Sequence, residues 1–133
     1  MDTEKLIKSK NLSILVVEDD ELSFLYINII LSKFCDNITR AKDGKSALDL
    51  VASKKFDVVL LDVNLPVMSG IEVANRIHQM YPKLGIILNS AFSSEGEEKY
   101  PLNKDNFVYL VKPLIREKVI KAIEKVLSSS DKD

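Results

Sequence analysis

Five short apolar runs alternate along this chain with longer segments whose apolar residues recur at helical spacing. The runs are residues 12–17, 37–41, 56–61, 85–89 and 107–111. All but the second are too continuously apolar to have a solvated face, as is typical of strands buried in a parallel sheet. The helical segments are residues 20–34, 45–53, 69–80, 93–104 and 114–127. Five strand–helix units with right-handed crossovers predict an α/β fold, a single doubly wound parallel sheet with helices on both faces.

Size and charge are those of one ordinary domain. The 133 residues are 46% hydrophobic, which is enough for one core, and they are too few for a closed barrel of eight strand–helix units. The net charge of -1 leaves no electrostatic footprint for nucleic acid or for an anionic membrane. We expect a domain over residues 11–127, with a frayed N-terminal arm over 1–10 and a frayed polar tail over 128–133.

The N-terminal segment and the single cysteine favour a cytoplasmic location. Residues 1–10 lack the apolar core of a signal peptide, and no stretch approaches the ~18 apolar residues of a membrane span. Cys35 follows the apolar end of a predicted helix, and we expect it to be a small core residue. His78 is expected to lie on the surface of the helix over residues 69–80.

Acidic side chains follow two of the predicted strands. The first strand is followed by Glu18, Asp19, Asp20 and Glu21, and the third is followed by Asp62. Because parallel strands end side by side, these carboxylates should converge on one small site. At about 4 Å two like charges repel by ~4 kcal/mol at an effective dielectric constant near 20, so the cluster requires a divalent cation or shared protons. Glu18 and Asp19 are the neighbouring pair best placed to hold Mg²⁺.

The other strand ends carry complementary polar groups. The fourth strand delivers Asn89 and Ser90, and the fifth is followed by Lys112 and Pro113. Taken singly, each polar residue has a plain structural explanation as a helix cap, a loop residue or a solvated side chain. Together, the acids, the hydroxyl group and the lysine suit phosphoryl transfer to a carboxylate. Asp62 is the natural acceptor, because it follows a fully apolar central strand.

Four separated segments resemble a known family. They are ILVVEDD at 14–20, VVLLDVNLPVMSG at 58–70, ILNSA at 87–91 and YLVKPL at 109–114. In residue type, order and spacing they resemble the response-regulator receiver domain, the phosphoacceptor half of two-component signalling, over residues 11–127. The resemblance implies a flavodoxin-like fold with five strands in the order 2-1-3-4-5. It also implies a signalling domain rather than a turnover enzyme, phosphorylated by a histidine kinase or a histidine phosphotransfer protein.

The resemblance gives roles to the acidic residues. Asp62 is the phosphorylated aspartate, and Glu18 with Asp19 is the acidic pair of the Mg²⁺ site, where Mn²⁺ is expected to substitute. Asn64 is expected to give the metal its backbone carbonyl oxygen. The implied metal site therefore contains Glu18, Asp19, Asp62 and the backbone of Asn64.

The resemblance also gives roles to the residues around the phosphoryl group. Ser90 is expected to contact that group through its hydroxyl, and Lys112 to bond it. Tyr109 is the aromatic switch that moves inward when the hydroxyl residue is drawn toward the phosphate. The bond Lys112–Pro113 matches a peptide bond that is cis in the family, an isomer that only prolyl bonds adopt at low energy.

Two positions depart from the usual pattern of the family. The hydroxyl residue is more often threonine, so Ser90 lacks a methyl group and the χ1 stiffness of a β-branched side chain. The predicted helix over residues 93–104 contains Gly96 and Pro101. Because proline inside a helix costs ~3 kcal/mol, we expect this helix to be shortened or irregular.

Two side chains are expected to set the lifetime of the phosphorylated state. In the family, the positions held here by Asn64 and Phe92 flank the path of water to the acyl phosphate. An amide can orient that water, whereas a phenyl ring can only obstruct it. The alternative is that Phe92 points away and packs on the irregular helix.

The predicted helix over residues 20–34 has more apolar surface than contact with the sheet requires. One stripe matches positions that pack on the sheet in this family, and it consists of Ile27, Ile30, Leu31 and Phe34. A second stripe, which we call the docking stripe, consists of Leu22, Leu25, Tyr26 and Ile29. We expect the docking stripe to bind the helical bundle of the phosphohistidine donor. Alternatively, the N-terminal arm buries it through Leu6 and Ile7.

Three other functions compete with this interpretation. A haloacid-dehalogenase-like phosphatase also has a nucleophilic aspartate after a strand, but it needs a second aspartate where this chain has Asn64. A flavin binder would cradle phosphate on its first loop, where residues 18–21 would repel it. A degenerate receiver that acts as a phosphate-independent scaffold is disfavoured by the intact acids, hydroxyl and lysine.

The chain fits a stand-alone receiver or the receiver of a hybrid kinase equally well, as a monomer or a weak dimer.

Overall fold

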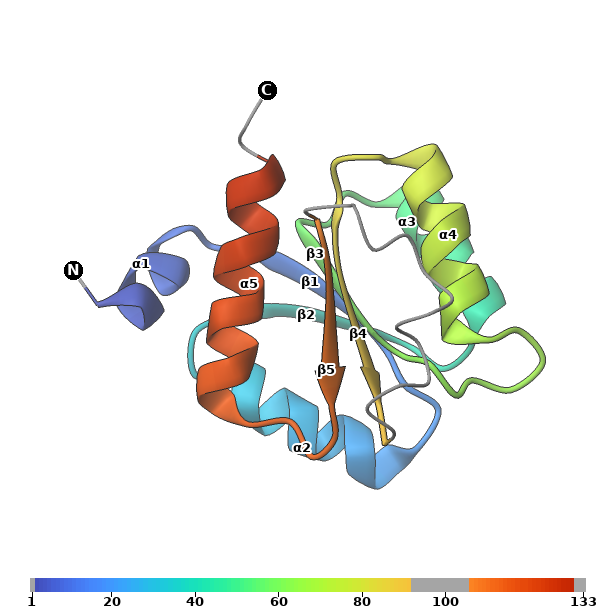
Figure 1. Cartoon of the computed structure of the whole chain (residues 1–133), viewed down its shortest axis with the longest axis horizontal. Coiled ribbons are helices and arrows are strands. Elements are labelled where there is room, and N and C mark those ends of the chain that lie inside the picture. Colours follow the sequence, from blue (N-terminus) through green and yellow to red (C-terminus); the bar gives the residue numbers. More distant parts are fainter. Residues whose placement is uncertain (1, 92–105, 131–133) are drawn as a thin grey trace.

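The computed structural model, which describes residues 2–91 and 106–130, contains a five-stranded parallel sheet (Figure 1). The strands are β1 (Ser13–Val17), β2 (Asn37–Ala41), β3 (Val58–Asp62), β4 (Gly85–Ser90) and β5 (Phe107–Val111). Their order across the sheet is β2-β1-β3-β4-β5. The predicted doubly wound fold and its strand order are therefore confirmed.

Helices cover both faces of the sheet. They are α1 (Thr3–Ser9), α2 (Glu21–Leu31), α3 (Gly44–Ser53), α4 (Gly70–Met80) and α5 (Arg116–Ser130). Figure 1 shows α2 and α5 on one face and α3 and α4 on the other. The predicted helix over residues 93–104 lies outside the described residues. Among the helices of the described ranges, none combines the length and the apolar character that crossing a membrane requires.

The central strand β3 separates two apolar cores. Alternate residues of a strand point to opposite faces, so Val58 and Leu60 pack under α2 and α5, whereas Val59 and Leu61 pack under α3 and α4. All five residues of β3 are buried, including Asp62 at its end. A strand that is apolar on both sides can hold this carboxyl-bearing end at a fixed place.

Polar side chains start the helices immediately after the strands. The carboxylates of Asp20 and Asp43 and the hydroxyl of Ser69 each accept a hydrogen bond from a backbone N–H three residues later. These contacts satisfy donors that the first turn of a helix leaves unpaired. Asp20 and Ser69 therefore lie one residue before α2 and α4, although the sequence placed them inside the helices.

The N-terminal arm is ordered, so the expected fraying was wrong there. Residues Thr3–Ser9 form α1, which follows the N-cap Asp2. Ile7 is buried in the core on the α2 and α5 side of the sheet, and Glu4 pairs with Arg116 at the start of α5. The C-terminal tail also differs, because α5 continues to Ser130. Long-range packing of one isoleucine and one ion pair orders a segment whose own composition is polar.

Two further expectations about burial need correction. The strand β5 is only partly buried, because it lies at the edge of the sheet. His78 is half-buried rather than exposed, and its ring packs edge-on against Phe107 with 5.2 Å between ring centroids. Cys35 is a buried free thiol, as predicted, and its Sγ donates to the carbonyl of Leu12.

The loop after β3 returns closely beneath the end of that strand. The N–H of Gly70 donates to the carbonyl of Val63 at 2.8 Å, and a Cβ at position 70 would lie 2.0 Å from the carbonyl oxygen of Asp62. Only glycine permits this approach. At the tip of the loop Val67 has φ 69, a left-handed conformation that costs a side-chain-bearing residue ~1–2 kcal/mol. The backbone around Asp62 is thus tightly constrained.

Candidate functional site

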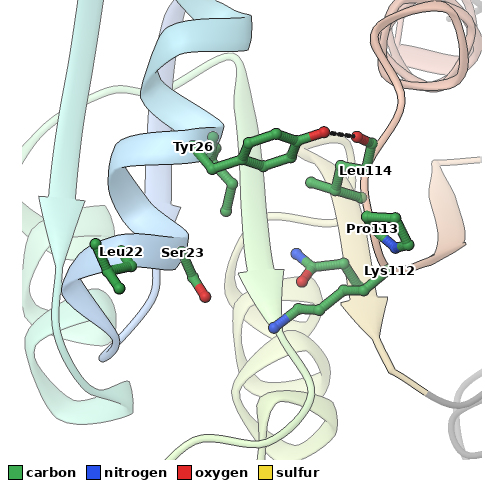
Figure 2. Close-up of a pocket in the computed structure, with 8 residues that line it drawn as sticks. Leu22, Ser23, Tyr26, Lys112, Pro113 and Leu114 are labelled. Carbon is green, nitrogen blue, oxygen red and sulfur yellow. Dashed lines mark hydrogen bonds between the residues drawn. The ribbon is translucent and has the colours of Figure 1, made fainter.

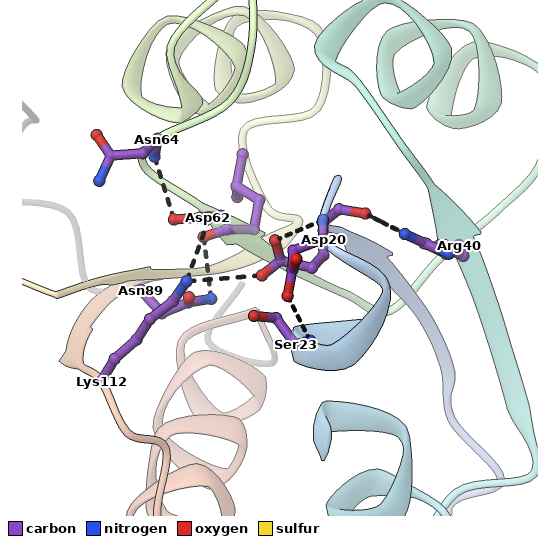
Figure 3. Close-up of polar contacts among 9 residues, drawn as sticks. Asp20, Ser23, Arg40, Asp62, Asn64, Asn89 and Lys112 are labelled. Atoms are coloured by element: carbon purple, nitrogen blue, oxygen red, sulfur yellow. Dashed lines mark hydrogen bonds and ion pairs between the residues drawn. The ribbon is translucent and has the colours of Figure 1, made fainter. Parts of the chain in front are cut away.

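Four strands bring their polar ends together at one edge of the sheet (Figure 3). Glu18 follows β1, Asp62 ends β3, Asn89 and Ser90 end β4, and Lys112 follows β5. Glu18 and Asp62 are only 1% and 5% exposed, respectively, although both carry carboxyl groups. The structure therefore brings together side chains that are up to 94 positions apart in sequence, from 18 to 112.

Three carboxylates form a cluster suited to a divalent cation. One oxygen from each of Glu18, Asp19 and Asp62 lies within 4.8 Å of the others. Glu18 Oε1 is buried, and it accepts no hydrogen bond from the residues that the structure describes. Burial raises the pKa of Glu18; the Asp20 N–H that donates to its carboxylate lowers it, and the charge of Asp62 raises it further. A hard cation would offset this repulsion and could be bound by Glu18 Oε1, so these residues fit Mg²⁺.

Lys112 reaches into the acidic cluster from the opposite side. Its Nζ lies 3.2 Å from Asp62 Oδ2 and 3.7 Å from Glu18 Oε1. Its backbone N–H donates to the carbonyl of Ser90 at 2.7 Å, and the bond Lys112–Pro113 is cis. The lysine is only partly exposed, so its charge acts on the carboxylates with less screening than a surface charge would.

The four consecutive acids have three different roles. Glu18 and Asp19 belong to the carboxylate cluster. Asp20 instead caps α2, and the hydrogen bond from the Ser23 N–H lowers its pKa. Glu21 turns outward to Arg40, and the hydrogen bond from that guanidinium lowers its pKa. Sequence reasoning did not foresee Arg40, because one arginine on a half-polar edge strand has no motif around it.

Of the other predicted site residues, Asn64 contacts the acceptor directly. The N–H of Asn64 donates to Asp62 Oδ1 at 3.1 Å, while the Asn64 side chain is exposed. Ser90 is fully buried at the end of β4, and Tyr109 is half-buried on the neighbouring β5. Phe92 lies outside the described residues.

A pocket of about 410 Å³ lies beside the acidic cluster, between α2 and the segment after β5 (Figure 2). Its walls include Leu22, Tyr26 and the cis pair Lys112–Pro113. The hydroxyl of Tyr26 donates to the carbonyl of Leu114 at 2.6 Å and so joins the two walls. Tyr26 therefore has an internal contact as well as an exposed ring face.

The docking stripe is exposed. Leu22, Leu25, Tyr26 and Ile29 are 76%, 51%, 48% and 63% exposed. The alternative, in which the N-terminal arm covers the stripe, is not what the structure has: Ile7 enters the core, and Leu6 is itself exposed. The residues of the other stripe, from Ile27 to Phe34, are buried as predicted.

Comparison with known proteins identifies the family. The family model of the response regulator receiver domain matches residues 14–124, so the chain belongs to this family. It is 33% identical over 117 residues to the transcriptional regulatory protein ZraR of Salmonella typhimurium strain LT2, a match that covers 88% of this chain and 26% of ZraR. The chain thus spans about a quarter of the length of that relative.

Two solved structures are similar over most of the chain. The signal receiver domain of an HD domain-containing protein from Pseudomonas fluorescens Pf-5 has a TM-score of 0.80 and 28% identity, covering 90% of this chain and 89% of that chain. The receiver domain of sensor histidine kinase PA1611 from Pseudomonas aeruginosa PAO1, with a magnesium ion coordinated in its active site cleft, has a TM-score of 0.77 and 25% identity. That match covers 89% of this chain and 98% of the other.

Family membership establishes the general function. Receiver domains are signalling domains of two-component systems rather than classical enzymes, and phosphorylation of an aspartate is general to them. They bind Mg²⁺ in an acidic pocket and interact with histidine kinases or phosphotransfer proteins. The acidic cluster of this chain has the composition that such a pocket requires.

The buried carboxyl group of Glu18 should make the stability of the metal-free protein depend on pH. Its pKa is raised above the ordinary value of 4.5, so the folded state retains a proton that the unfolded chain releases in the window above 4.5. By proton linkage, this group lowers the free energy of unfolding as pH rises through that window. Glu18→Gln removes the contribution, so the variant should gain stability relative to wild type as pH rises.

Urea unfolding in the presence of EDTA, at a series of pH values, measures this difference. Asp49→Asn, on the exposed side of α3, is the matched control and should follow wild type. A difference between Glu18→Gln and wild type that stays constant with pH would contradict the assignment.

Proposed function

We propose that this domain accepts a phosphoryl group on Asp62 from a partner's phosphohistidine, with Mg²⁺, and signals through a conformational change. The observation that supports this most directly is the contact between Asp62 Oδ2 and Lys112 Nζ at 3.2 Å, within a cluster of three carboxylates. A carboxylate that is buried at a strand end, beside a lysine and a cation site, is suited to attack a phosphoryl group.

The proposed step uses residues of this chain in separate roles. An Asp62 carboxylate oxygen forms the bond to phosphorus, the bond from phosphorus to the donor imidazole nitrogen breaks, and that nitrogen takes up a proton. Lys112 neutralises charge on the phosphoryl oxygens. Glu18, Asp19 and the carbonyl of Asn64 would hold Mg²⁺, which supplies positive charge between the carboxylates and the incoming oxygens.

We assign the output to Ser90 and Tyr109. Ser90 ends β4 and pairs in register with Val111 of β5, two residues beyond Tyr109. A shift of the serine hydroxyl toward a phosphoryl group on Asp62 would vacate space next to the tyrosine ring. The ring would then move inward and change the surface of β5.

The proposal also covers the oligomeric state of the domain, its compartment and the kind of protein that contains it. We propose a monomer or weak dimer that acts in the cytoplasm, where the free thiol of Cys35 is in keeping with a reducing compartment. The relatives include a transcriptional regulator and a sensor kinase, so a stand-alone receiver and a hybrid-kinase receiver both fit. A phosphatase is disfavoured, because an exposed amide at Asn64 occupies the position of its second acid.

Treatment with acetyl phosphate and Mg²⁺ tests the acceptor. Wild type should gain one phosphoryl group in intact-mass analysis, and Asp62→Asn should gain none, because an amide is not nucleophilic enough to form the acyl phosphate. Asp49→Asn, a matched change on α3, should be labelled like wild type. Labelling of Asp62→Asn to the extent of wild type would place the acceptor elsewhere.

The docking stripe generates a second test. Leu25→Ala or Ile29→Ala should slow transfer from a phosphohistidine donor by roughly tenfold, the effect of losing about 1.4 kcal/mol of apolar contact. Labelling by acetyl phosphate should be unchanged, because a small donor does not need this surface. Met80→Ala removes an exposed apolar side chain from α4 and should alter neither rate. If the rates of phosphorylation by both donors fell equally, the stripe would be needed for the folded structure and not for docking of the donor.

The lifetime of the phosphorylated state provides a third test. We propose that the Asn64 amide orients the attacking water and that Phe92 obstructs it. Asn64→Ala should therefore slow loss of phosphate from Asp62, and Phe92→Ala should speed it; each ~1.4 kcal/mol in the barrier changes the rate tenfold. Decay of the phosphorylated protein, followed by intact mass, gives both rates. A Phe92→Ala decay equal to or slower than that of wild type would eliminate shielding by the ring.

A further inference from the structure

Arg40 of β2, which Figure 3 shows beside the acidic cluster, makes three hydrogen bonds to the acidic segment 18–21 and one cation–π contact with Phe24. Its Nε and Nη2 donate to the backbone carbonyl of Glu18 at 3.1 and 3.0 Å. Its Nη1 donates to the carboxylate of Glu21 at 2.8 Å, and the guanidinium carbon lies 4.7 Å from the centre of the Phe24 ring. The arginine side chain is only 14% exposed. Such a fully engaged guanidinium has little freedom to move.

These contacts hold the peptide group that joins the two acids of the proposed metal pair. The carbonyl that accepts from Arg40 belongs to the bond between Glu18 and Asp19. On the other side of the same residue, the N–H of Glu18 donates to the carbonyl of Ala41 at 3.0 Å. Both the carbonyl and the N–H of Glu18 are therefore hydrogen-bonded to residues at the end of β2. Rotation of the Glu18–Asp19 peptide would break both hydrogen bonds from Arg40 Nε and Nη2 to the Glu18 carbonyl.

The residue that Arg40 holds in this way carries a buried carboxylate oxygen of the cluster. Glu18 is 1% exposed, and its Oε1 accepts no hydrogen bond among the described residues. Arg40 does not touch this carboxylate, since its bonds go to the main chain and to Glu21. Its influence on a cation would therefore act through the position of Glu18 and Asp19.

We propose that Arg40 is a positioning residue for the metal site and that it favours Mg²⁺ over Ca²⁺. The inference rests on the proposed function, which places the metal at Glu18, Asp19 and Asp62. Mg²⁺ demands near-ideal octahedral geometry at about 2.0–2.1 Å, whereas Ca²⁺ accepts six to eight ligands at roughly 2.3–2.6 Å in flexible arrangements. A rigid pair of acids suits the smaller ion, and loosening the pair should harm Mg²⁺ more than Ca²⁺.

The variant Arg40→Lys distinguishes an effect of Arg40 on the position of the acids from an effect of its positive charge. Lysine keeps the positive charge, but its single ammonium cannot reproduce the planar fork that holds the Glu18 carbonyl and Glu21 together. A purely electrostatic effect changes the affinity for two divalent ions by the same factor. The ratio of Mg²⁺ affinity to Ca²⁺ affinity is therefore the informative measurement, and general destabilisation does not produce a selective change in it.

The experiment is calorimetric titration of the metal-free chain with Mg²⁺ and, separately, with Ca²⁺ at constant ionic strength. Arg40→Lys should weaken Mg²⁺ binding about tenfold and Ca²⁺ binding less than about threefold, in the range seen when a group that supports metal ligands is lost. Arg76→Lys is the matched control, because Arg76 also pairs with a glutamate, Glu72, but lies on α4. It should leave both affinities unchanged.

Urea unfolding in EDTA shows whether each variant is folded. If Arg40→Lys does not fold, Glu21→Gln decides the question, because Glu21 is exposed and its loss frees only one arm of the arginine. This variant should lower the Mg²⁺ to Ca²⁺ ratio in the same direction by a smaller factor. An unchanged ratio in the folded variant overturns the role of Arg40.

Asp19→Asn distinguishes this failure from failure of the proposed metal site. That variant should weaken binding of both ions, because it removes an anionic ligand. If Asp19→Asn leaves Mg²⁺ affinity unchanged, the metal lies elsewhere and the proposed site itself is wrong. If Asp19→Asn weakens binding while Arg40→Lys preserves the ratio, only the positioning role is wrong.

Discussion

The contact of Lys112 with the buried carboxylates of Glu18 and Asp62 is the interaction that the rest of the structure has to support. Two carboxylates at the end of an apolar sheet are costly, and one partly exposed lysine offsets only part of that cost. The two apolar cores on either side of β3 provide the stability that allows this arrangement. The constrained loop through Gly70 belongs to the same arrangement, because it keeps the backbone of Asp62 from relaxing.

Elements that are set by local sequence patterns could be predicted, whereas elements that depend on long-range contacts could not. The apolar runs around Asp62 predicted the sheet, and the parallel topology then required the strand ends to meet, so the acidic cluster could be anticipated. The helix α1 could not, because its order depends on Ile7 reaching a core built by distant segments and on pairing with Arg116. Arg40 was missed for a similar reason: besides the Glu21 carboxylate, its partners are a main-chain carbonyl and a ring face, neither of which a sequence pattern marks.

Tyr26 joins two parts of the molecule that have separate proposed roles. Its ring belongs to the docking stripe, while its hydroxyl holds the Leu114 carbonyl two residues beyond Lys112. A helical partner that lies on the stripe would therefore press on the same segment that carries the lysine. If the stripe binds the donor as proposed, donor recognition and the placement of the lysine would be linked through one side chain, and the pocket beside Tyr26 would leave room for small adjustments.

The N-cap at Asp20 has a consequence for how the site can hold an anion. A helix N-terminus carries a partial positive charge and exposed N–H groups, and many phosphate sites use both. Here α2 begins directly beside the acidic cluster, but Asp20 already occupies the Ser23 N–H and sets a negative charge on the helix dipole. The capping carboxylate therefore makes this helix start less suited to bind a phosphate. Positive charge for a phosphoryl group is instead offered by the Lys112 ammonium, and Mg²⁺ at the proposed site would add to it. Under that proposal, the attraction of the site for a phosphoryl group would depend on the supply of metal.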